Sequence, residues 1–424
     1  MNAKNTSDSN STNYAAFIGI DWADQQHVWA LQAAGQTQVQ TGTLKQKPEA
    51  IGTWVAQLRQ RFGGQPVAIA LEQSRGALLH GLAAYDFLVL YPLPSTTMAE
   101  FRAALRPSGA KDDPHDAGLI LELLLKHRDR FRPWRPDTEQ TRLLGRLVED
   151  RRKAVNLRAR HVQALQASLK EYYPQALDLL QGNVTSRLAA DLLAKWPTLP
   201  EFQKAKPAAI RKFYYGHNVR SPQVIQQALE LAHTAQPLTS DPAIVESGQC
   251  LSQMHVQLIQ SLNPAIATYD RRIQQVFDAH PEGHLFSHLP GAGPALAPRL
   301  LAFFGTDRSR YTSAEQIQSY TGIAPATVSS GKSRVSFFRV ACPKFDRQTF
   351  HEFARLSVAK SAWAKSYVDY YTGRGKKYHA TIRALAFKWI RVLFRCWQTG
   401  TRYDEQRYLA ALQRRGSVFA GVQV

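Results

Sequence analysis

The sequence predicts an α/β domain near the N-terminus, followed by a chain that is helical almost throughout. Two alternating apolar runs on either side of Asp21, residues 16–20 and 27–31, predict a strand and its returning partner. The unbroken apolar run of residues 66–71 predicts a strand that is buried on both faces. From residue 137 onwards, apolar residues recur every three or four positions over long stretches, which is the period of a helix.

The order of the N-terminal elements narrows the fold class. Three strands in a meander occupy residues 16–43, with the third at 37–43, and they are followed by a helix at 48–62, the strand at 66–71, a helix at 76–85 and a strand at 87–91. This order predicts a sheet of ribonuclease H type. Catalytic groups gather at the strand ends of such sheets.

Acidic residues follow two of these strands and begin a later helix. Asp21 ends the first strand and Glu72 ends the buried one. Asp113 and Asp116 precede the helix 118–126 and share its core-facing side, whereas Asp112 points elsewhere. Each position also has a structural interpretation, because Asp21 suits a turn, Asp113 before a proline suits a helix cap, and Asp116 suits a capping box.

Asp21, Glu72, Asp113 and Asp116 would repel one another strongly if they met at one sheet edge. That arrangement is reasonable only around a cation. Carboxylate oxygens without histidine or cysteine favour Mg²⁺ or Mn²⁺ over zinc. Two such ions are able to hold a scissile phosphate from both sides. The alternative is that the acids only cap helices and turns.

The charge of the chain is uneven. It carries 53 lysines and arginines against 33 aspartates and glutamates, a formal net charge of +20 in 424 residues. Residues 286–424 hold 22 of the basic and 7 of the acidic residues, which is +15 of that total. A positive charge concentrated in this way favours a nucleic-acid partner over a membrane. The alternative is that the basic residues only keep the surface soluble.

Other features place the protein inside the cell. The three cysteines indicate neither disulfides nor a zinc site. We expect no signal peptide and no membrane span, and residues 1–14 read as a disordered tail. With about two to four domains expected for this length, the predicted boundaries are 15–136, 137–285 and 286–424.

The middle region is predicted to be a helical coiled coil. Long helices at 137–173 and 250–277 carry narrow apolar stripes that suit pairing within or between chains. Residues 174–245, inserted between them, predict short helices without assigned chemistry. Arg151, Arg152 and Arg158 are dense enough to suggest phosphate contact, although a solvated helix face is the alternative.

The C-terminal region contains two small-residue motifs. Gly291 and Gly293 open a helix in a way that resembles the helix-hairpin-helix motif for DNA backbones, and a plain glycine turn is the alternative. Residues 327–334 predict a loop in which Lys332 and Arg334 flank two serines, a pattern that by itself more often marks a flexible turn than a nucleophile. The remainder predicts basic helices with interleaved aromatic residues at 346–369, 377–397 and 403–414.

Taken in order, these segments resemble a family of bacterial insertion-sequence transposases. GIDWA, ALEQSRG and KDDPHDAGLI resemble the family's DEDD tetrad, here Asp21, Glu72, Asp113 and Asp116. LPGAGP, SYTGIAPATVSSGKS and CPKFDRQTFHEFA resemble its C-terminal transposase domain. The resemblance covers roughly residues 16–136 and 286–400. Each motif alone is a weak signal, but the series of motifs in this order is specific to the family.

The resemblance implies a fold, an activity and partners. The N-terminal domain would be RuvC-like, the middle would be a coiled coil for assembly, and the C-terminal domain would carry a nucleophilic serine. That serine precedes a glycine, which makes it Ser330, with Ser329 beside it as the alternative. The protein would act in the bacterial cytoplasm, at the nucleoid, as a tetramer assembled from dimers. A structured bridge RNA would guide it to donor and target double-stranded DNA.

Three functions therefore remain open from the sequence. In the first, Ser330 attacks the phosphate and forms a covalent DNA intermediate while the tetrad holds Mg²⁺. In the second, a metal-dependent nuclease of the Holliday-junction resolvase type uses water and Ser330 is structural. In the third, the protein only binds nucleic acid. A trapped protein–DNA adduct separates the first from the second, and any metal-dependent cleavage removes the third.

Overall fold

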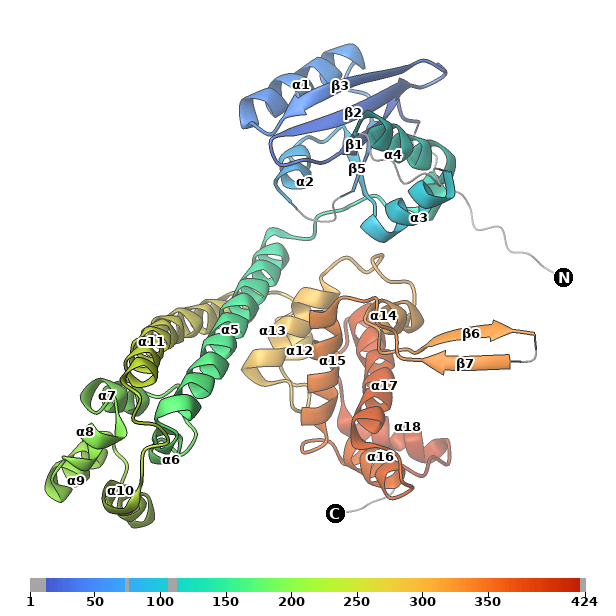
Figure 1. Ribbon diagram of the computed structural model, residues 1–424. Helices are drawn as coiled ribbons and strands as arrows, with labels where there is room; N and C mark the ends of the chain where they lie inside the picture. The colour runs from blue at the N-terminus through green and yellow to red at the C-terminus, as the bar shows by residue number, and fades with distance from the viewer. Residues whose placement is uncertain (1–12, 73–75, 106–112, 332, 420–424) are drawn as a thin grey trace. The chain divides into compact units, whose positions relative to one another are not determined.

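The computed structural model divides the chain into two compact units, Met1–Pro136 and Asp137–Val424 (Figure 1). It describes residues 13–72, 76–105, 113–331 and 333–419. The N-terminal unit combines a sheet with helices, and the C-terminal unit is helical apart from one hairpin. Among the described residues, no helix is both long enough and apolar enough to cross a membrane.

A five-stranded sheet forms the centre of the N-terminal unit. Its spatial order is β3-β2-β1-β4-β5, in which β1, β2 and β3 pair antiparallel and β4 and β5 run parallel to β1. The strands span Ala16–Asp21 (β1), Gln26–Ala33 (β2), Val39–Lys45 (β3), Val67–Leu71 (β4) and Leu88–Pro92 (β5). Every residue of β4 is buried, as the unbroken apolar run predicts. The predicted meander and the two later strands are confirmed.

Helices cover both faces of this sheet. Helix α1 (Pro48–Arg61) and helix α2 (Ala77–Leu82) pack on one face, where their leucines and Trp54 meet the isoleucines of β1 and β4. Helix α3 (Ser95–Leu105) and helix α4 (Asp113–His127) pack on the other face. The sequence did not predict α3, because no regular apolar stripe marks it, and among its described side chains Met98 and Phe101 are the ones that join the core.

Two long helices form the spine of the C-terminal unit. Helix α5 (Glu139–Tyr172) packs along helix α11 (Pro242–Asp278), so the narrow apolar stripes pair within one chain. Helix α11 begins eight residues before the predicted Cys250, at a proline that follows the capping residue Asp241. Five short helices close the far end of this pair around a shared core, and they are α6 (Gln175–Leu179), α7 (Arg187–Lys195), α8 (Leu199–Gln203), α9 (Pro207–Gly216) and α10 (Pro222–Thr234).

The remaining helices pack around the other end of the pair. They are α12 (Gly283–Phe286), α13 (Gly293–Phe304), α14 (Ala314–Tyr320), α15 (Lys344–Ser357), α16 (Ala362–Thr372), α17 (Tyr378–Thr399) and α18 (Glu405–Arg414). Leu144 of α5 and Ile273 of α11 belong to the same core as Trp389 of α17, so the chain shows no separation into compact units near residue 285.

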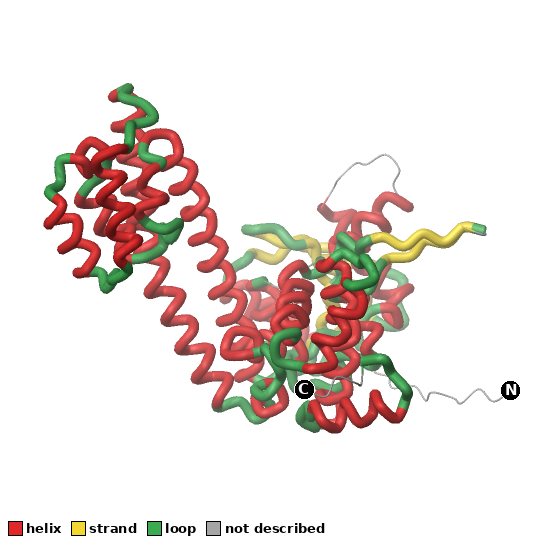
Figure 2. Tube along the Cα trace, turned by 90° about the horizontal axis from the view of Figure 1, so that it is seen from below, coloured by secondary structure: helices red, strands yellow, loops and turns green. Residues whose placement is uncertain are grey.

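Two predictions for this region are wrong. The single helix predicted at 346–369 is two helices, α15 and α16, which are separated near Ser361. The loop predicted at 327–334 is instead a β-hairpin of β6 (Ala326–Ser330) and β7 (Ser333–Phe337). Its strands extend away from the helices of this unit (Figure 2). Alternating polar and apolar residues explain the strands, but the many small residues hide that pattern.

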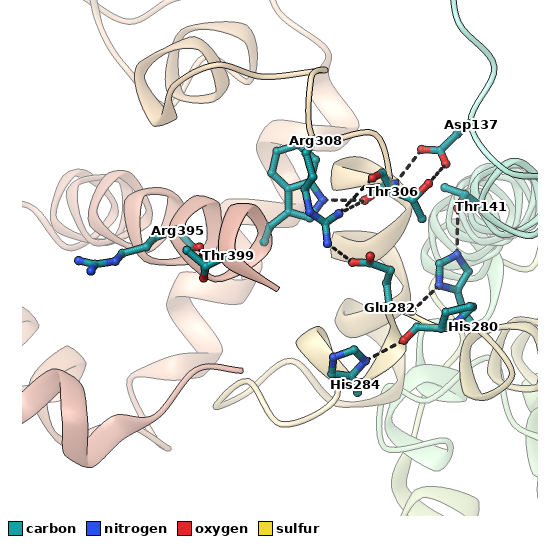
Figure 3. Close-up of polar contacts among 12 residues, drawn as sticks. Asp137, Thr141, His280, Glu282, His284, Thr306, Arg308, Arg395 and Thr399 are labelled. Atoms are coloured by element: carbon teal, nitrogen blue, oxygen red, sulfur yellow. Dashed lines mark hydrogen bonds and ion pairs between the residues drawn. The ribbon is translucent and has the colours of Figure 1, made fainter. Parts of the chain in front are cut away.

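A polar clasp joins the start of α5 to the loop after α13 (Figure 3). Asp137 accepts hydrogen bonds from the backbone N–H of Thr306 at 2.9 Å and from its hydroxyl at 2.5 Å. Burial alone would raise the pKa of Asp137, but these hydrogen bonds outweigh it and the pKa is lowered. A side chain at Gly305 would collide with the Asp137 carboxylate, which explains the glycine in the FFGT motif.

A histidine pair between α5 and α11 predicts a pH-dependent stability. His161 and His255 lie with their Nδ1 atoms 3.2 Å apart. Burial, and secondly His161, lower the pKa of His255 below 6.5. The unfolded chain therefore binds this proton more readily, so the stability is complete above about pH 6.5 and is lost as the pH falls through the folded pKa.

We expect the melting temperature of the wild-type protein to fall more between about pH 7.5 and about pH 5 than that of His161→Gln, because the variant has no second histidine to lower the pKa of His255. Thermal unfolding followed by circular dichroism at both pH values measures this difference. An equal fall in both proteins would show that the pair does not carry the pH dependence.

Candidate active site

The sheet register brings two of the predicted acids to neighbouring strand ends. Ile20 of β1 pairs with Leu71 of the parallel strand β4. Asp21 and Glu72 are the next residues along these two strands, and each is partly exposed. Parallel strands end at the same edge of a sheet, so the two carboxylates lie at one edge, as the sequence predicts.

Helix α4 brings Asp116 to the same strand. A Cβ at Gly19 of β1 would lie 2.4 Å from the backbone oxygen of Ala117 and from the backbone nitrogen of Leu121. This contact is possible only because residue 19 lacks a side chain. Asp116 precedes Ala117 and is buried, with 3% of its surface exposed. The glycine of the GIDWA segment therefore determines how closely Asp116 approaches the first strand.

Arg102 of α3 lies among these acids. Its Nε atom donates a hydrogen bond to Asp116 Oδ1 at 2.8 Å, and its Nη2 atom lies 4.0 Å from Glu72 Oε2. The hydrogen bond to Asp116 raises the pKa of the guanidinium, and the charges of Asp116, Glu72 and Asp21 raise it further. Three acidic residues from separate elements thus act on one cation.

The second carboxylate oxygen of Asp116 offers a direct test of whether a metal ion suits this site. Oδ2 is buried, and none of the described residues hydrogen-bonds to it. A buried carboxylate oxygen without a donor is costly, and a divalent cation is a suitable partner for it. The donor set around Arg102 consists of carboxylates, as Mg²⁺ prefers. The chemistry of these donors therefore suits a magnesium or manganese ion.

The tetrad is not complete in the part of the chain that the structure describes. Within those residues, no three acidic, histidine or cysteine side chains are grouped closely enough to hold a metal. Asp113 is the first residue of α4, but its side chain lies outside the described residues, and so does Asp112. Asp116 stands one helical turn after Asp113, on the side of Ile120 and Leu124, which are fully buried.

Arg102 is the residue that sequence reasoning missed at this site. It belongs to a helix that was not predicted, and one arginine among 53 basic residues carries no signal of its own. Arg102 lies fourteen residues before Asp116 in the chain. Local pairing rules connect residues three or four positions apart, so they could not identify this pair.

Replacing Arg102 with methionine is expected to destabilise the metal-free protein by about 2–4 kcal/mol, because Asp116 would keep a buried charge without its partner. Magnesium should restore more stability to the variant than to the wild type, since the cation replaces the lost charge. Thermal unfolding with a chelator and with Mg²⁺ measures both effects.

Arg59→Met is the matched control for this substitution. It removes an arginine from an exposed ion pair with Asp86 in the same unit, so little change is expected. If Arg102→Met were no more destabilising than Arg59→Met, the role of Arg102 as the counter-charge would be wrong.

Ser330 lies at the tip of the hairpin. It pairs with Ser333 across the turn that contains Gly331, whose φ of +55° favours glycine. Ser330 is exposed. The hairpin sequence, residues 326–337, contains no acidic residue and no histidine. The hairpin itself therefore offers no carboxylate or imidazole that could activate a serine hydroxyl.

The two serines belong to opposite faces of the hairpin. Side chains alternate along a strand, and the register places Ser329 opposite Arg334 on a polar face, where Thr327 and Ser336 share a hydrogen bond of 2.9 Å. Ser330 lies on the other face with Val328, Val335 and Phe337, which are 57%, 56% and 48% exposed. An exposed apolar face of this kind suits contact with another surface.

The basic residues predicted on α5 have partners within the protein. Arg151 forms an ion pair with Asp270, Arg158 donates a hydrogen bond to Asn263 at 3.0 Å, and Arg152 donates one to Gln348. These contacts connect α5 to α11 and α15, so the three arginines have a structural role whether or not they also touch phosphate.

The predicted glycine and loop residues have different surroundings. A side chain at Gly291 would collide with the backbone of Leu356, so this glycine permits a close approach to α15. Gly293 is exposed at the start of α13, where its positive φ of +53° favours glycine. Arg334 is exposed on β7, and Lys332 lies outside the described residues.

Two family models match the chain in the order of its units. A transposase model of the DEDD type of IS110 matches residues 18–174, which include the sheet, its acids and α5. A second model, described as the transposase IS116/IS110/IS902 family, matches residues 283–369, which include the hairpin. The chain belongs to the DEDD-type IS110 family of transposases. It is therefore a DNA-processing enzyme of an insertion sequence, as the motifs suggest.

Two proteins of Streptomyces coelicolor resemble this transposase over nearly their whole length. One, described as the mini-circle transposase for IS117, is 26% identical over 421 residues, which cover 93% of this chain and 97% of the relative. Another, an uncharacterized 43.6 kDa protein of insertion element IS110, is 24% identical over 406 residues, which cover 92% and 96%.

Proposed function

We propose that this transposase is a serine recombinase that cuts and rejoins donor and target DNA through a covalent link to Ser330. The observation that carries the proposal is the register of Asp21 and Glu72 at neighbouring strand ends, with Asp116 buried beside the first strand. The strand order β3-β2-β1-β4-β5 is the order expected of a ribonuclease H or RuvC-like domain, and it supports assigning the catalytic edge there.

Asp21, Glu72, Asp113 and Asp116 would hold one or two Mg²⁺ or Mn²⁺ ions in this proposal. When bound, the metal supplies positive charge next to the scissile phosphate. Asp116 could offer its Oδ2 atom while Arg102 keeps Oδ1, whereas a ligand role for both oxygens of Asp116 or for Glu72 would require the guanidinium to move away. Arg102 would then be free to reach the phosphate of the DNA, where its charge remains useful.

Ser330 would act as the nucleophile. Its oxygen attacks the phosphorus atom, its proton leaves to a base or to solvent, and the released 3′ or 5′ oxygen becomes the leaving group. The phosphoester bond to Ser330 preserves the energy needed for rejoining, and the end of the partner strand later displaces the serine. Gly331 lets the backbone turn close to the phosphate, and Lys332 and Arg334 carry charge suited to it.

The active site would be shared between protomers of a tetramer. The hairpin has no acidic residue and no histidine of its own, and its exposed apolar face suits contact with a second surface. A structured bridge RNA would bind the basic surface of residues 286–424 together with the basic helix α5, through shape and phosphates. Sequencing the RNA that copurifies with the protein tests this part, and heterogeneous cellular RNA alone would contradict guidance.

A nuclease that uses water as the nucleophile is the second candidate. The carboxylate edge alone would be sufficient for it, and the exposed position of Ser330 on a hairpin is compatible with a structural serine. The deciding experiment incubates the protein with Mg²⁺ and radiolabelled element-end DNA, denatures it, and looks for protein-bound label. A covalent adduct supports the recombinase, whereas cleaved DNA without an adduct supports the nuclease.

A further inference from the structure

A cavity of about 500 Å³ opens in the C-terminal unit, between the base of the hairpin and α17. Ile323, Tyr367 and Phe387 form part of its apolar wall. Arg383, Lys388 and Arg391, all on α17, supply its charge. None of the described residues that line it is acidic. This basic pocket therefore joins apolar surface to positive charge, and its size is within the range of small-molecule sites.

Lys388 lies against two aromatic rings in the basic pocket, and no acidic side chain among the described residues is paired with it. The Nζ atom of Lys388 lies 4.9 Å from the centre of the Tyr367 ring and 4.7 Å from that of Phe419. Burial lowers the pKa of the Lys388 ammonium, and the neighbouring charge of Arg391 lowers it further. An anion placed between Lys388 and Arg391 would relieve this repulsion.

The same situation recurs at the other side of the pocket. The guanidinium carbons of Arg347 and Arg383 lie 4.5 Å and 4.4 Å from the centre of the Phe338 ring. Burial lowers the pKa of Arg383, and the charge of Arg347 contributes to the shift. Lys388 and Arg391 thus form one pair of neighbouring cations in the pocket, and Arg383 forms a second pair with Arg347, which lies behind Phe338; both pairs favour a negatively charged ligand.

An exposed aromatic surface adjoins these cations. Phe337 and Phe338 end the hairpin at its base, line the pocket, and are 48% and 41% exposed. Rings of this kind offer a stacking surface to a base. Phosphate-binding cations beside a stacking ring are the pairing that single-stranded nucleic acid requires.

The hairpin connects this pocket to Ser330. The register Ala326–Phe337, Val328–Val335 and Ser330–Ser333 places Phe337 and Ser330 on one face of the hairpin. Position 330 lies four residue steps along the strand from position 326, a distance of about 13 Å. A strand of nucleic acid with one nucleotide in the pocket could follow this face to the serine.

We propose that the basic pocket binds one unpaired nucleotide of DNA or RNA, with a phosphate between Lys388 and Arg391 and the base against Phe337. This inference rests on the proposed function, because it assigns an unpaired nucleotide near the strand that Ser330 attacks. A base inside a duplex is stacked and paired, so only a single-stranded or flipped nucleotide can enter.

The experiment measures the binding of fluorescein-labelled oligo-dT, oligo-U and a DNA duplex of equal length to the full-length protein by anisotropy. The variants are Lys388→Met, which keeps the apolar stem, and Phe337→Ala, which changes an exposed ring. Lys365→Met, an exposed lysine of α16 outside the pocket, is the matched control. Thermal unfolding verifies that each variant is folded.

We expect Lys388→Met and Phe337→Ala each to weaken single-strand binding about tenfold. Duplex binding should change by about twofold or less, as in the control. A preference for oligo-dT or oligo-U identifies the source of the nucleotide, and equal loss for both supports recognition of the shared chemistry. The proposal would be wrong if the pocket variants bound single strands as tightly as the wild type. It would also be wrong if they lost duplex affinity equally, or if Lys365→Met lost as much single-strand affinity as they did.

The covalent-adduct assay separates this inference from the proposed function. If the wild-type protein forms the Ser330 adduct while the pocket variants bind single strands normally, the proposal that the pocket binds a nucleotide is wrong and the recombinase mechanism is supported. If the pocket variants lose single-strand binding while the wild type forms no adduct, nucleotide binding by the pocket is supported and the serine mechanism is wrong.

Discussion

Ser330→Ala is expected to abolish both strand cleavage and the covalent protein–DNA adduct, a loss of more than about a thousandfold. The reason is chemical, because alanine has no oxygen with which to store the cut strand as a phosphoester. A nuclease that uses water would tolerate the change. Gel analysis of denatured reactions on labelled element-end DNA measures cleavage and adduct together.

Ser329→Ala is the matched control for the nucleophile. Ser329 is the adjacent residue, is also exposed, and belongs to the opposite, polar face of the hairpin. We expect this variant to keep most of the cleavage and of the adduct. If Ser329→Ala loses cleavage and adduct while Ser330→Ala keeps them, Ser329 is the nucleophile. If both variants keep cleavage, the mechanism that uses water is supported.

Asp21→Asn is expected to lose cleavage to a similar extent while the protein still folds and binds RNA. Asparagine keeps the shape of the side chain but removes the negative charge that a divalent cation needs. Asp24→Asn is the control, since Asp24 is exposed in the turn after the same strand. Cleavage rates in Mg²⁺ and unfolding temperatures separate a catalytic loss from a folding defect. An active Asp21→Asn protein would contradict the carboxylate site.

Mixing the two inactive proteins tests whether the site is shared. Ser330→Ala retains its carboxylates and Asp21→Asn retains its serine, so some mixed assemblies would combine intact partners from different protomers. Partial recovery of cleavage is expected. If the mixture stays inactive although both variants oligomerise, the serine and the carboxylates act within one chain.

Local patterns predicted the core of the N-terminal unit well. Alternating apolar residues around Asp21 and the buried run before Glu72 gave β1, β2 and β4 within one or two residues. These patterns work because the side-chain period of a strand is two and a fully buried strand has no polar residue. The acids at the strand ends were visible for the same reason.

Tertiary contacts determined the features that the patterns missed. Arg102 meets Asp116 and Glu72 only because α3 and α4 pack on the same face of the sheet. Helix α3 depends on a few apolar contacts rather than on a stripe, so a local pattern could not identify it. The hairpin that carries Ser330 was interpreted as a loop because its small residues weaken the strand signal.

By itself the sequence determined the order of the elements, the acids at the strand ends, the serine motif and the basic C-terminal region, because periodicity, composition and spacing are local properties. Only the tertiary structure decided that Gly19 lets α4 approach β1, that Arg102 lies beside Asp116 and Glu72, and that Phe337, Lys388 and Arg391 line one pocket. Each of these facts joins residues far apart in the chain, and their approach depends on how whole elements pack.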